Sequence, residues 1–186
     1  KIEFTYGPDL MRVKTKLYSN STLLQTKYFA LGNYEEEIDE TSGITTKYYY
    51  ISGGNGLAAI YKQQGSAAGT MYYVHKDHLG SIDLLTDDNG NVAERYAYDA
   101  WGNRRNPTNW QQPDTRTNLL ISRGYTAQEH LAAFGLINLN GRMYEPLTAR
   151  FLSPDNYIKA PGFSQSINRY GYCWNNPLSY IDPNGY

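Results

Sequence analysis

The first hundred residues alternate between short runs rich in Tyr, Thr and Ile and short clusters of Gly, Asn, Ser and Asp. Runs of this kind, bounded by turn-forming residues, are typical of half-buried β-strands. Asn89-Gly90 predicts a type I′ hairpin turn, because both central positions of that turn need a positive φ. The pattern predicts strands at Lys14–Tyr18, Thr26–Leu31, Thr45–Ile51, Leu57–Lys62, Thr70–His75, Ile82–Thr86 and Val92–Tyr98.

Aromatic runs recur along these strands and indicate an internal repeat. They open at Tyr28, Tyr49, Tyr72 and Tyr96, at separations of 21, 23 and 24 residues. A period of roughly 20–50 residues is typical of stacked supersecondary units, because a single hairpin cannot bury its own apolar face. An ordinary meander of hairpins would also space tyrosines in this way, and we favour the repeat over that alternative.

The chain changes character after residue 102. Asn103–Asn118 is rich in Asn, Gln, Pro and Thr, which predicts a long, mobile surface loop. Thr126 and Glu129 have capping-box spacing, which predicts one short helix near 126–134 that ends at Gly135. The tail is dense in Pro, Asn and Gly and predicts turns and short strands. We therefore expect a mainly β chain in three segments, with β-hairpins at 1–102, the loop at 103–118 and a turn-rich core at 119–186.

Composition narrows the class of function. Tyr is abundant, with 19 residues against 5 Phe, and the chain also contains 17 Gly. Both features agree with a β-rich fold that has many turns. The 17 basic and 18 acidic residues leave a net charge of -1, so we expect no nucleic-acid partner. No apolar run approaches the roughly 20 residues of a membrane span. The single cysteine, Cys173, excludes an internal disulfide, and we expect it to be buried and inert.

A metal site and a sugar site are the other chemical alternatives. His75, Asp77 and His78 are residue types that bind metals, but on a strand residue 78 faces away from the other two. We therefore expect packed histidines, and predict no metal and no cofactor. Exposed tyrosines suit sugar rings, although cross-strand pairs are the favoured interpretation.

Several motifs follow one another in a specific order. They are His75–Ser81 with Thr86–Gly90, then Tyr96–Asn103, then Gly135–Tyr144 with Ala149–Asp155, and finally Asn168–Tyr172, Asn175–Pro177 and Asp182–Gly185. Tyr96–Asn103 resembles a Tyr-Asp repeat. Together the motifs resemble the Rhs/YD-repeat family and its repeat-associated core domain, from about Tyr72 to Tyr186. The first seventy residues resemble the upstream repeats only loosely.

The resemblance implies a fold and a function. Members of this family wind a β-ribbon into a hollow shell, and the core domain closes one end. The shell encloses a C-terminal passenger, which in polymorphic toxins is the toxin itself. We therefore expect two partners, the passenger and the upstream repeats of the same shell, within a larger bacterial polypeptide that is secreted or lies at the cell surface. The residues do not identify the passenger.

Many cores of this family are also aspartyl autoproteases, which cut just after a Pro-x-x-x-x-Asp-Pro-x-Gly motif. The resemblance places the cut at about Tyr186 and narrows the catalytic carboxyls to Asp155 and Asp182. Arg150 is the favoured cation beside them, and Lys159 is the second candidate. The cleavage motif comprises Pro177, Asp182, Pro183, Gly185 and Tyr186.

Aspartyl proteolysis needs two carboxyls close enough to share a proton, so that one activates water and the other polarises the scissile carbonyl. Asn156 stands where many relatives have Pro, and Ala149 where many have Gly, but neither change removes a catalytic group. The alternative is a structural or carbohydrate-binding surface domain that never cuts. In that interpretation Asp155 and Asp182 only form turns, and Arg150 is a surface ion partner.

Overall fold

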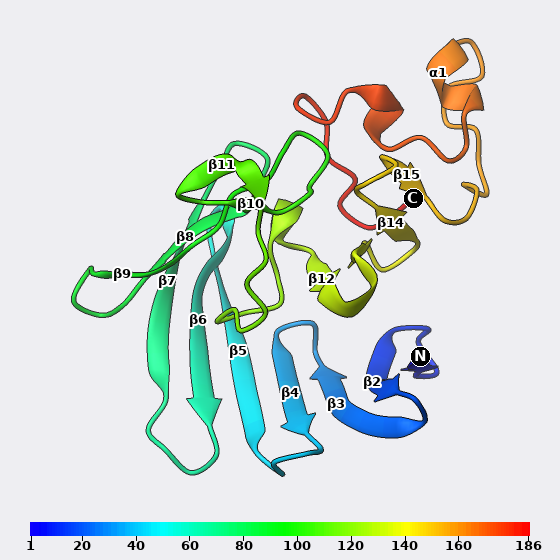
Figure 1. Ribbon diagram of the computed structural model, residues 1–186. Coiled ribbons are helices and arrows are strands. Elements are labelled where there is room, and N and C mark those ends of the chain that lie inside the picture. Colours follow the sequence, from blue (N-terminus) through cyan, green and yellow to red (C-terminus); the bar gives the residue numbers. More distant parts are fainter. The chain divides into compact units, whose positions relative to one another are not determined.

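The computed structural model describes residues 1–186, which form two compact units. The first unit comprises Lys1–Val74 and Thr86–Asn91, and the second comprises His75–Leu85 and Val92–Tyr186. Figure 1 shows the long strands of the first unit and the short strands and turns of the second. The sequence predicts a different division of the chain, into residues 1–102, 103–118 and 119–186. That three-part division stays a prediction.

Antiparallel strands of the first unit pair in the order of the sequence. They are β1 (Ile2–Tyr6), β2 (Arg12–Ser19), β3 (Thr22–Ala30), β4 (Tyr34–Asp39), β5 (Thr45–Gly53), β6 (Gly56–Gln64) and β7 (Thr70–Lys76). The predicted strands in this region are confirmed. The sequence pattern missed β1 and β4.

The sequence pattern did not predict strand β4 because its sequence, Tyr-Glu-Glu-Glu-Ile-Asp, is rich in acidic residues. Glu35 is buried and accepts a hydrogen bond from the Tyr50 hydroxyl at 3.0 Å. Glu37 forms an ion pair with the buried Lys27 at 3.2 Å. Partners on the neighbouring strands β5 and β3 thus allow these acidic residues to lie in a sheet.

Tyrosines form a cross-strand ladder in this sheet. Tyr34 on β4 lies opposite Tyr49 on β5, which in turn lies opposite Tyr61 on β6. Their ring centroids are 5.0 Å and 6.0 Å apart. Such pairs each stabilise a sheet by about 0.2–1 kcal/mol. The interpretation of tyrosines as cross-strand pairs is confirmed for these three.

One turn design occurs three times and explains the Asp-x-x-Gly motifs. Asp77, Asp87 and Asp99 each accept, at one carboxylate oxygen, the N–H groups of the residues two and four positions later. The glycine three positions after each aspartate is left-handed, with φ of 83°, 78° and 90°. The expected type I′ turn at Asn89-Gly90 is wrong in type, because Asn89 lacks a positive φ and the Asp87 carboxylate stabilises a longer loop. This loop joins β8 (Ile82–Thr86) to β9 (Val92–Arg95).

The second unit contains a small antiparallel sheet over an aromatic core. Its strands are β12 (Glu129–Leu131), β13 (Leu136–Asn138), β14 (Met143–Glu145) and β15 (Arg150–Phe151). Tyr144 and Tyr125 are buried in this core and donate to the carbonyls of Trp101 and Ala100 at 2.8 Å and 2.9 Å. The core is thereby tied to the Asp99 turn. Its members are Leu79, Tyr125, Ile137, Leu139, Tyr144, Phe151 and Tyr172.

The mainly β prediction is confirmed, but the helix expected near 126–134 is not there. Short 3₁₀ turns at Tyr125–Ala127 and Ala132–Phe134 flank strand β12 instead. Thr126 has a left-handed φ of 47°, and the Tyr125 N–H bonds to the Nε2 atom of His130 at 3.0 Å rather than to a helical carbonyl. The α-helix of the chain is the short α1 (Ser164–Ile167), and a third 3₁₀ turn spans Cys173–Asn175. None of these helices has the length and apolar character to cross a membrane.

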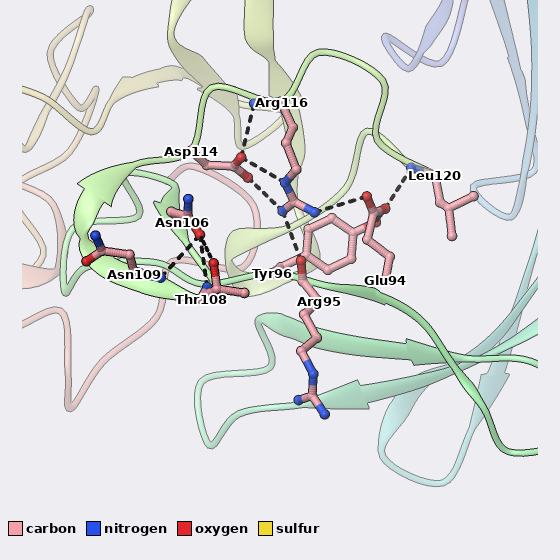
Figure 2. Close-up of polar contacts among 9 residues, drawn as sticks. All are labelled: Glu94, Arg95, Tyr96, Asn106, Thr108, Asn109, Asp114, Arg116 and Leu120. Carbon is pink, nitrogen blue, oxygen red and sulfur yellow. Dashed lines mark hydrogen bonds and ion pairs between the residues drawn. The ribbon is translucent and has the colours of Figure 1, made fainter.

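The expected loop at 103–118 contains a hairpin, formed by β10 (Arg105–Asn106) and β11 (Asn109–Pro113). Arg116 fastens its return, as Figure 2 shows. The guanidinium forms ion pairs with Asp114 at 2.8 Å and Glu94 at 3.3 Å, and donates to the carbonyl of Arg95 at 2.9 Å. Glu94 also accepts the N–H of Leu120 at 2.7 Å. The segment is therefore tied at several points to strand β9.

Candidate functional site

Asp155 and Asp182 both form ion pairs with one guanidinium, that of Arg142. The Nη2 atom of Arg142 is 3.3 Å from Oδ2 of Asp155 and 3.5 Å from Oδ2 of Asp182. The two carboxylate oxygens are therefore separated by no more than the sum of these distances. The side chains of Arg142, Asp155 and Asp182 are only 6%, 13% and 10% exposed. The fold thus brings together two aspartates that are remote in sequence.

Arg142 was not among the residues predicted from the sequence. It follows β13 in the turn before β14, and its guanidinium carbon lies 3.6 Å from the centroid of the Phe151 ring. Its Nε donates to the carbonyl of Gly185 at 2.6 Å, and its Nη1 to the carbonyl of Arg169 at 3.1 Å. A planar guanidinium suits this task, because it offers several donors at fixed angles.

The structure corrects the choice of Arg150 as the cation beside the carboxyls. Arg150 is exposed, and its Nη1 lies 3.5 Å from Oδ1 of Asn168. The neighbouring Phe151 is buried, and successive side chains of a strand point to opposite faces. Since Phe151 occupies the core side of β15, Arg150 faces away from the core. The only signal for Arg142 was its place in the Gly135–Tyr144 motif.

Asp182 closes a fourth Asp-x-x-Gly turn, at the end of the chain. Its Oδ1 accepts the N–H groups of Gly185 at 2.8 Å and Tyr186 at 3.1 Å, and that of Asn184 at 3.4 Å. Gly185 has a left-handed φ of 77°. One oxygen of Asp182 therefore shapes the tail while the other lies beside Arg142.

Asp155 is held from its backbone and its side chain. Its N–H donates to the carbonyl of Arg169 at 2.8 Å, and its own carbonyl accepts Nε of Arg169 at 2.5 Å. Its Oδ1 accepts the N–H of Tyr157 at 2.9 Å. Fewer backbone donors occupy this carboxylate than that of Asp182, which leaves more of it open to a small molecule such as water.

Four consecutive carbonyls of the tail each accept a hydrogen bond from a different residue of the second unit. The carbonyl of Pro183 accepts Nε2 of Gln128 at 2.9 Å, and that of Asn184 accepts the N–H of Gly141 at 2.9 Å. The carbonyl of Gly185 accepts Nε of Arg142 at 2.6 Å, and that of Tyr186 accepts Nζ of Lys159. Lys159, the second candidate for the cation beside the two carboxyls, instead contacts Tyr186. Cationic donors polarise the carbonyls that they contact.

A pocket of about 220 Å³ opens over this site. Arg142, Asp155, Lys159, Asp182 and Tyr186 line it, together with Cys173. Burial raises the pKa of the Cys173 thiol to about 12, so that the thiol stays neutral at physiological pH. A neutral thiol is a weak nucleophile, which agrees with the expectation that Cys173 is inert. The acidic and basic side chains are therefore the candidate catalytic groups of this pocket.

The histidine and aspartate groups considered as metal ligands have structural partners. His78 Nε2 lies 3.1 Å from the carbonyl of Leu178, and Asp77 holds its own turn. His130 accepts the N–H of Tyr125, and burial, aided by the charge of Arg104, places its pKa well below the usual range. These contacts support packing roles for His78, Asp77 and His130.

An aromatic β-meander with Asp-x-x-Gly turns and a turn-rich core defines the class of YD-repeat shell proteins. Residues 19–178 match the model of the Teneurin YD-shell family, and the chain belongs to that family. The resemblance to YD-repeat proteins is thereby confirmed.

Two curated relatives and one solved structure illustrate the similarity. The chain is 34% identical over 165 residues to the tRNA nuclease WapA of Bacillus subtilis, covering 87% of this chain and 7% of that protein. It is 33% identical over 165 residues to the tRNA3(Ser)-specific nuclease WapA of Bacillus spizizenii, with 87% and 7% covered. The crystal structure of TcdB2-TccC3 without its hypervariable C-terminal region has a TM-score of 0.75 at 21% identity, covering 100% of this chain and 9% of that one. The chain thus spans less than a tenth of these relatives.

Proposed function

We propose that this chain is the C-terminal shell and plug portion of an Rhs-type toxin or secreted repeat protein, and that it cuts its own polypeptide after the Pro177–Gly185 motif, at about Tyr186. One observation carries the proposal. Arg142 contacts the carboxylates of Asp155 and Asp182 and the carbonyl of Gly185 at once. This contact supports the proposal, because it holds the predicted acidic pair beside the peptide that precedes the bond proposed to be cut.

The proposed reaction is hydrolysis of the peptide bond that follows Tyr186. A water molecule attacks the Tyr186 carbonyl carbon and gives its proton to Asp155, the carboxylate with fewer backbone donors. In this chain Lys159 contacts an oxygen of the terminal carboxyl group of Tyr186, and in the longer chain it would stabilise the negative charge that develops on the Tyr186 carbonyl oxygen. That proton then passes from Asp155 to the leaving amine as the carbon–nitrogen bond breaks, and the carboxylic acid left on Tyr186 gives its remaining proton to the solvent or to the amine and becomes a carboxylate. Asp182 and Arg142 hold the tail in position relative to the Asp155 carboxylate.

Mass spectrometry of a chain extended past Tyr186 by a small reporter tests the cut. The wild-type chain should lose the extension, whereas Asp155→Asn and Asp182→Asn should keep it. Arg150→Gln is the matched control and should cut like the wild type, because Arg150 is exposed and its guanidinium contacts Asn168, whereas Arg142 forms the ion pairs with the carboxyls. An extended wild-type chain that stays intact would contradict the proposal.

Enclosure of a passenger is the second part of the proposal. The relatives are named nucleases, and we propose a toxin passenger here that follows the plug in a secreted or cell-surface protein. Strand β1 pairs with β2 alone among the strands of its unit, so its outer edge suits pairing with an upstream repeat. We therefore expect the isolated chain to self-associate in light scattering. A clean monomer would count against a missing neighbour at β1.

A non-cutting surface domain is the alternative, and two observations favour it. Asp182 accepts the N–H groups of the residues two and four positions later, as the three structural aspartates do. The Tyr34, Tyr49 and Tyr61 ladder also offers aromatic faces of the kind that bind sugars. A glycan array with the intact chain tests the sugar alternative. Binding that is lost in Tyr49→Ala would support it, and a signal at background would oppose it.

A further inference from the structure

The C-terminal segment lies directly against the turn between β13 and β14. A Cβ atom added to Gly185 would stand 2.8 Å from the backbone nitrogen of Arg142 and 2.8 Å from the carbonyl oxygen of Leu139. On the other side, the N–H of Gly141 donates to the carbonyl of Asn184. The backbone of the C-terminal segment is therefore in direct contact with the backbone of this turn, and the turn fixes the position of the segment.

Gly141 makes room for the side chain of Tyr186. A Cβ atom at residue 141 would lie 2.5 Å from Cε2 and 2.7 Å from Cζ of the Tyr186 ring, and 2.8 Å from the Asn184 carbonyl oxygen. These separations are shorter than a carbon–carbon contact allows. Gly141 is not among the residues with a positive φ, so its backbone conformation does not require glycine. Residue 141 must be small because the Tyr186 ring and the Asn184 carbonyl oxygen occupy the space that a Cβ atom would need.

The position of the Tyr186 ring is coupled to the atoms of the proposed cut. The N–H of Tyr186 donates to Oδ1 of Asp182 at 3.1 Å, and its carbonyl accepts Nζ of Lys159. A ring displaced from Gly141 would therefore move the carbonyl away from Lys159. Displacements of this size matter, since misplacement by about 1 Å can slow a positioned reaction by roughly a hundredfold.

We propose that Gly141 is the residue that determines which side chain is accepted at position 186, and that it positions the chain for the cut. This inference rests on the proposed self-cleavage. Glycine at 141 admits an aromatic ring at 186, whereas a larger residue at 141 restricts position 186 to small side chains. Gly141 acts through Tyr186 and is a positioning residue rather than a catalytic one.

A double-substitution experiment on the extended chain tests the assignment. We expect Gly141→Ala to slow cleavage by roughly tenfold to a hundredfold. In a Tyr186→Ala background the ring is absent and only the clash with the Asn184 carbonyl oxygen remains, so Gly141→Ala should slow cleavage clearly less than it does beside Tyr186, which is the non-additivity expected of residues in contact. Gly162→Ala is the matched control, because a Cβ atom there meets nothing within 4 Å. Equal slowing by Gly141→Ala in both backgrounds would overturn the assignment.

Hydrogen exchange separates this inference from the proposed cleavage. In the chain that ends at Tyr186, Gly141→Ala should speed exchange of the Tyr186 amide, while Gly162→Ala should not. If the extended wild type stays intact but this exchange response appears, the seat for residue 186 stands and the cleavage proposal fails. If the wild type is cut and Gly141→Ala changes neither the cleavage rate nor the exchange, the role of Gly141 is refuted and the cleavage proposal stands.

Discussion

Arg142 donates from its Nε to the carbonyl oxygen of Gly185 at 2.6 Å, across 43 residues of sequence. The same guanidinium lies beside both aspartates of the candidate site. It therefore links the turn before β14, the Asp155 segment and the C-terminal motif. Unfolding measurements on single substitutions test this contact and others in the fold.

Arg142→Met should destabilise the second unit strongly. The substitution leaves two largely buried carboxylates without their cation, and breaking such buried pairs costs about 3–5 kcal/mol. Urea unfolding of the wild type and the variant measures this free energy. Arg150→Met is the matched control and should lie within about 0.5 kcal/mol of the wild type, as is usual at exposed positions. Equal effects of the two substitutions would contradict the assignment of Arg142 as the central cation.

Gly102→Ala should cost more stability than Gly80→Ala. Both glycines are left-handed, with φ of 90° and 83°. This backbone conformation destabilises an alanine by roughly 1–2 kcal/mol. At Gly102 the added Cβ would also stand 2.7 Å from Cδ1 of Tyr125, whereas at Gly80 it meets nothing within 4 Å. Overpacking adds about 1–3 kcal/mol. Thermal unfolding of the two variants would show the difference, and a larger loss in Gly80→Ala would refute it.

The Arg116 network should weaken in acid. Hydrogen bonds from Arg116 hold the pKa of Asp114 below its usual value of 3.8. The stabilisation by ionised Asp114 is therefore complete above pH 3.8 and is lost as the pH falls through the lower pKa of the folded state. Between pH 5 and pH 2, the free-energy difference between the wild type and Arg116→Gln should shrink. A difference that stays constant over this range would show that the Asp114 pair does not contribute.

His130 should give the fold a second pH dependence, at higher pH. Burial lowers its pKa in the folded state well below 6.5, so the unfolded chain takes up a proton first as the pH falls. Stability is then complete above pH 6.5 and declines below it. His130→Gln keeps an acceptor for the Tyr125 N–H but does not titrate, and its unfolding free energy should vary less between pH 7.5 and 5.5. A pH profile of His130→Gln identical to that of the wild type would argue against this role.

Strand positions in the first unit were readable from the residues themselves. Alternating Tyr, Thr and Ile at β3, β5 and β6 report a half-buried surface, and this signal is local to each strand. Strand β4 escaped notice because its acidic residues depend on Tyr50 and Lys27, which lie on other strands. The capping-box pair Thr126 and Glu129 misled for the same reason, since the bond from Tyr125 to His130 and the pairing of β12 with β13 decide that segment.

The candidate site shows the same division between local and distant information. The family motifs alone pointed to Asp155, Asp182 and the tail, and Lys159 was named because it follows Asp155 closely in the sequence. Choosing Arg142 over Arg150 required the tertiary structure. Both arginines lie in recognised motifs, and only the packing of Phe151 into the core determines that one faces the carboxyls while the other faces solvent. Contacts between residues far apart in the chain depend on packing, which no local pattern of residue types records.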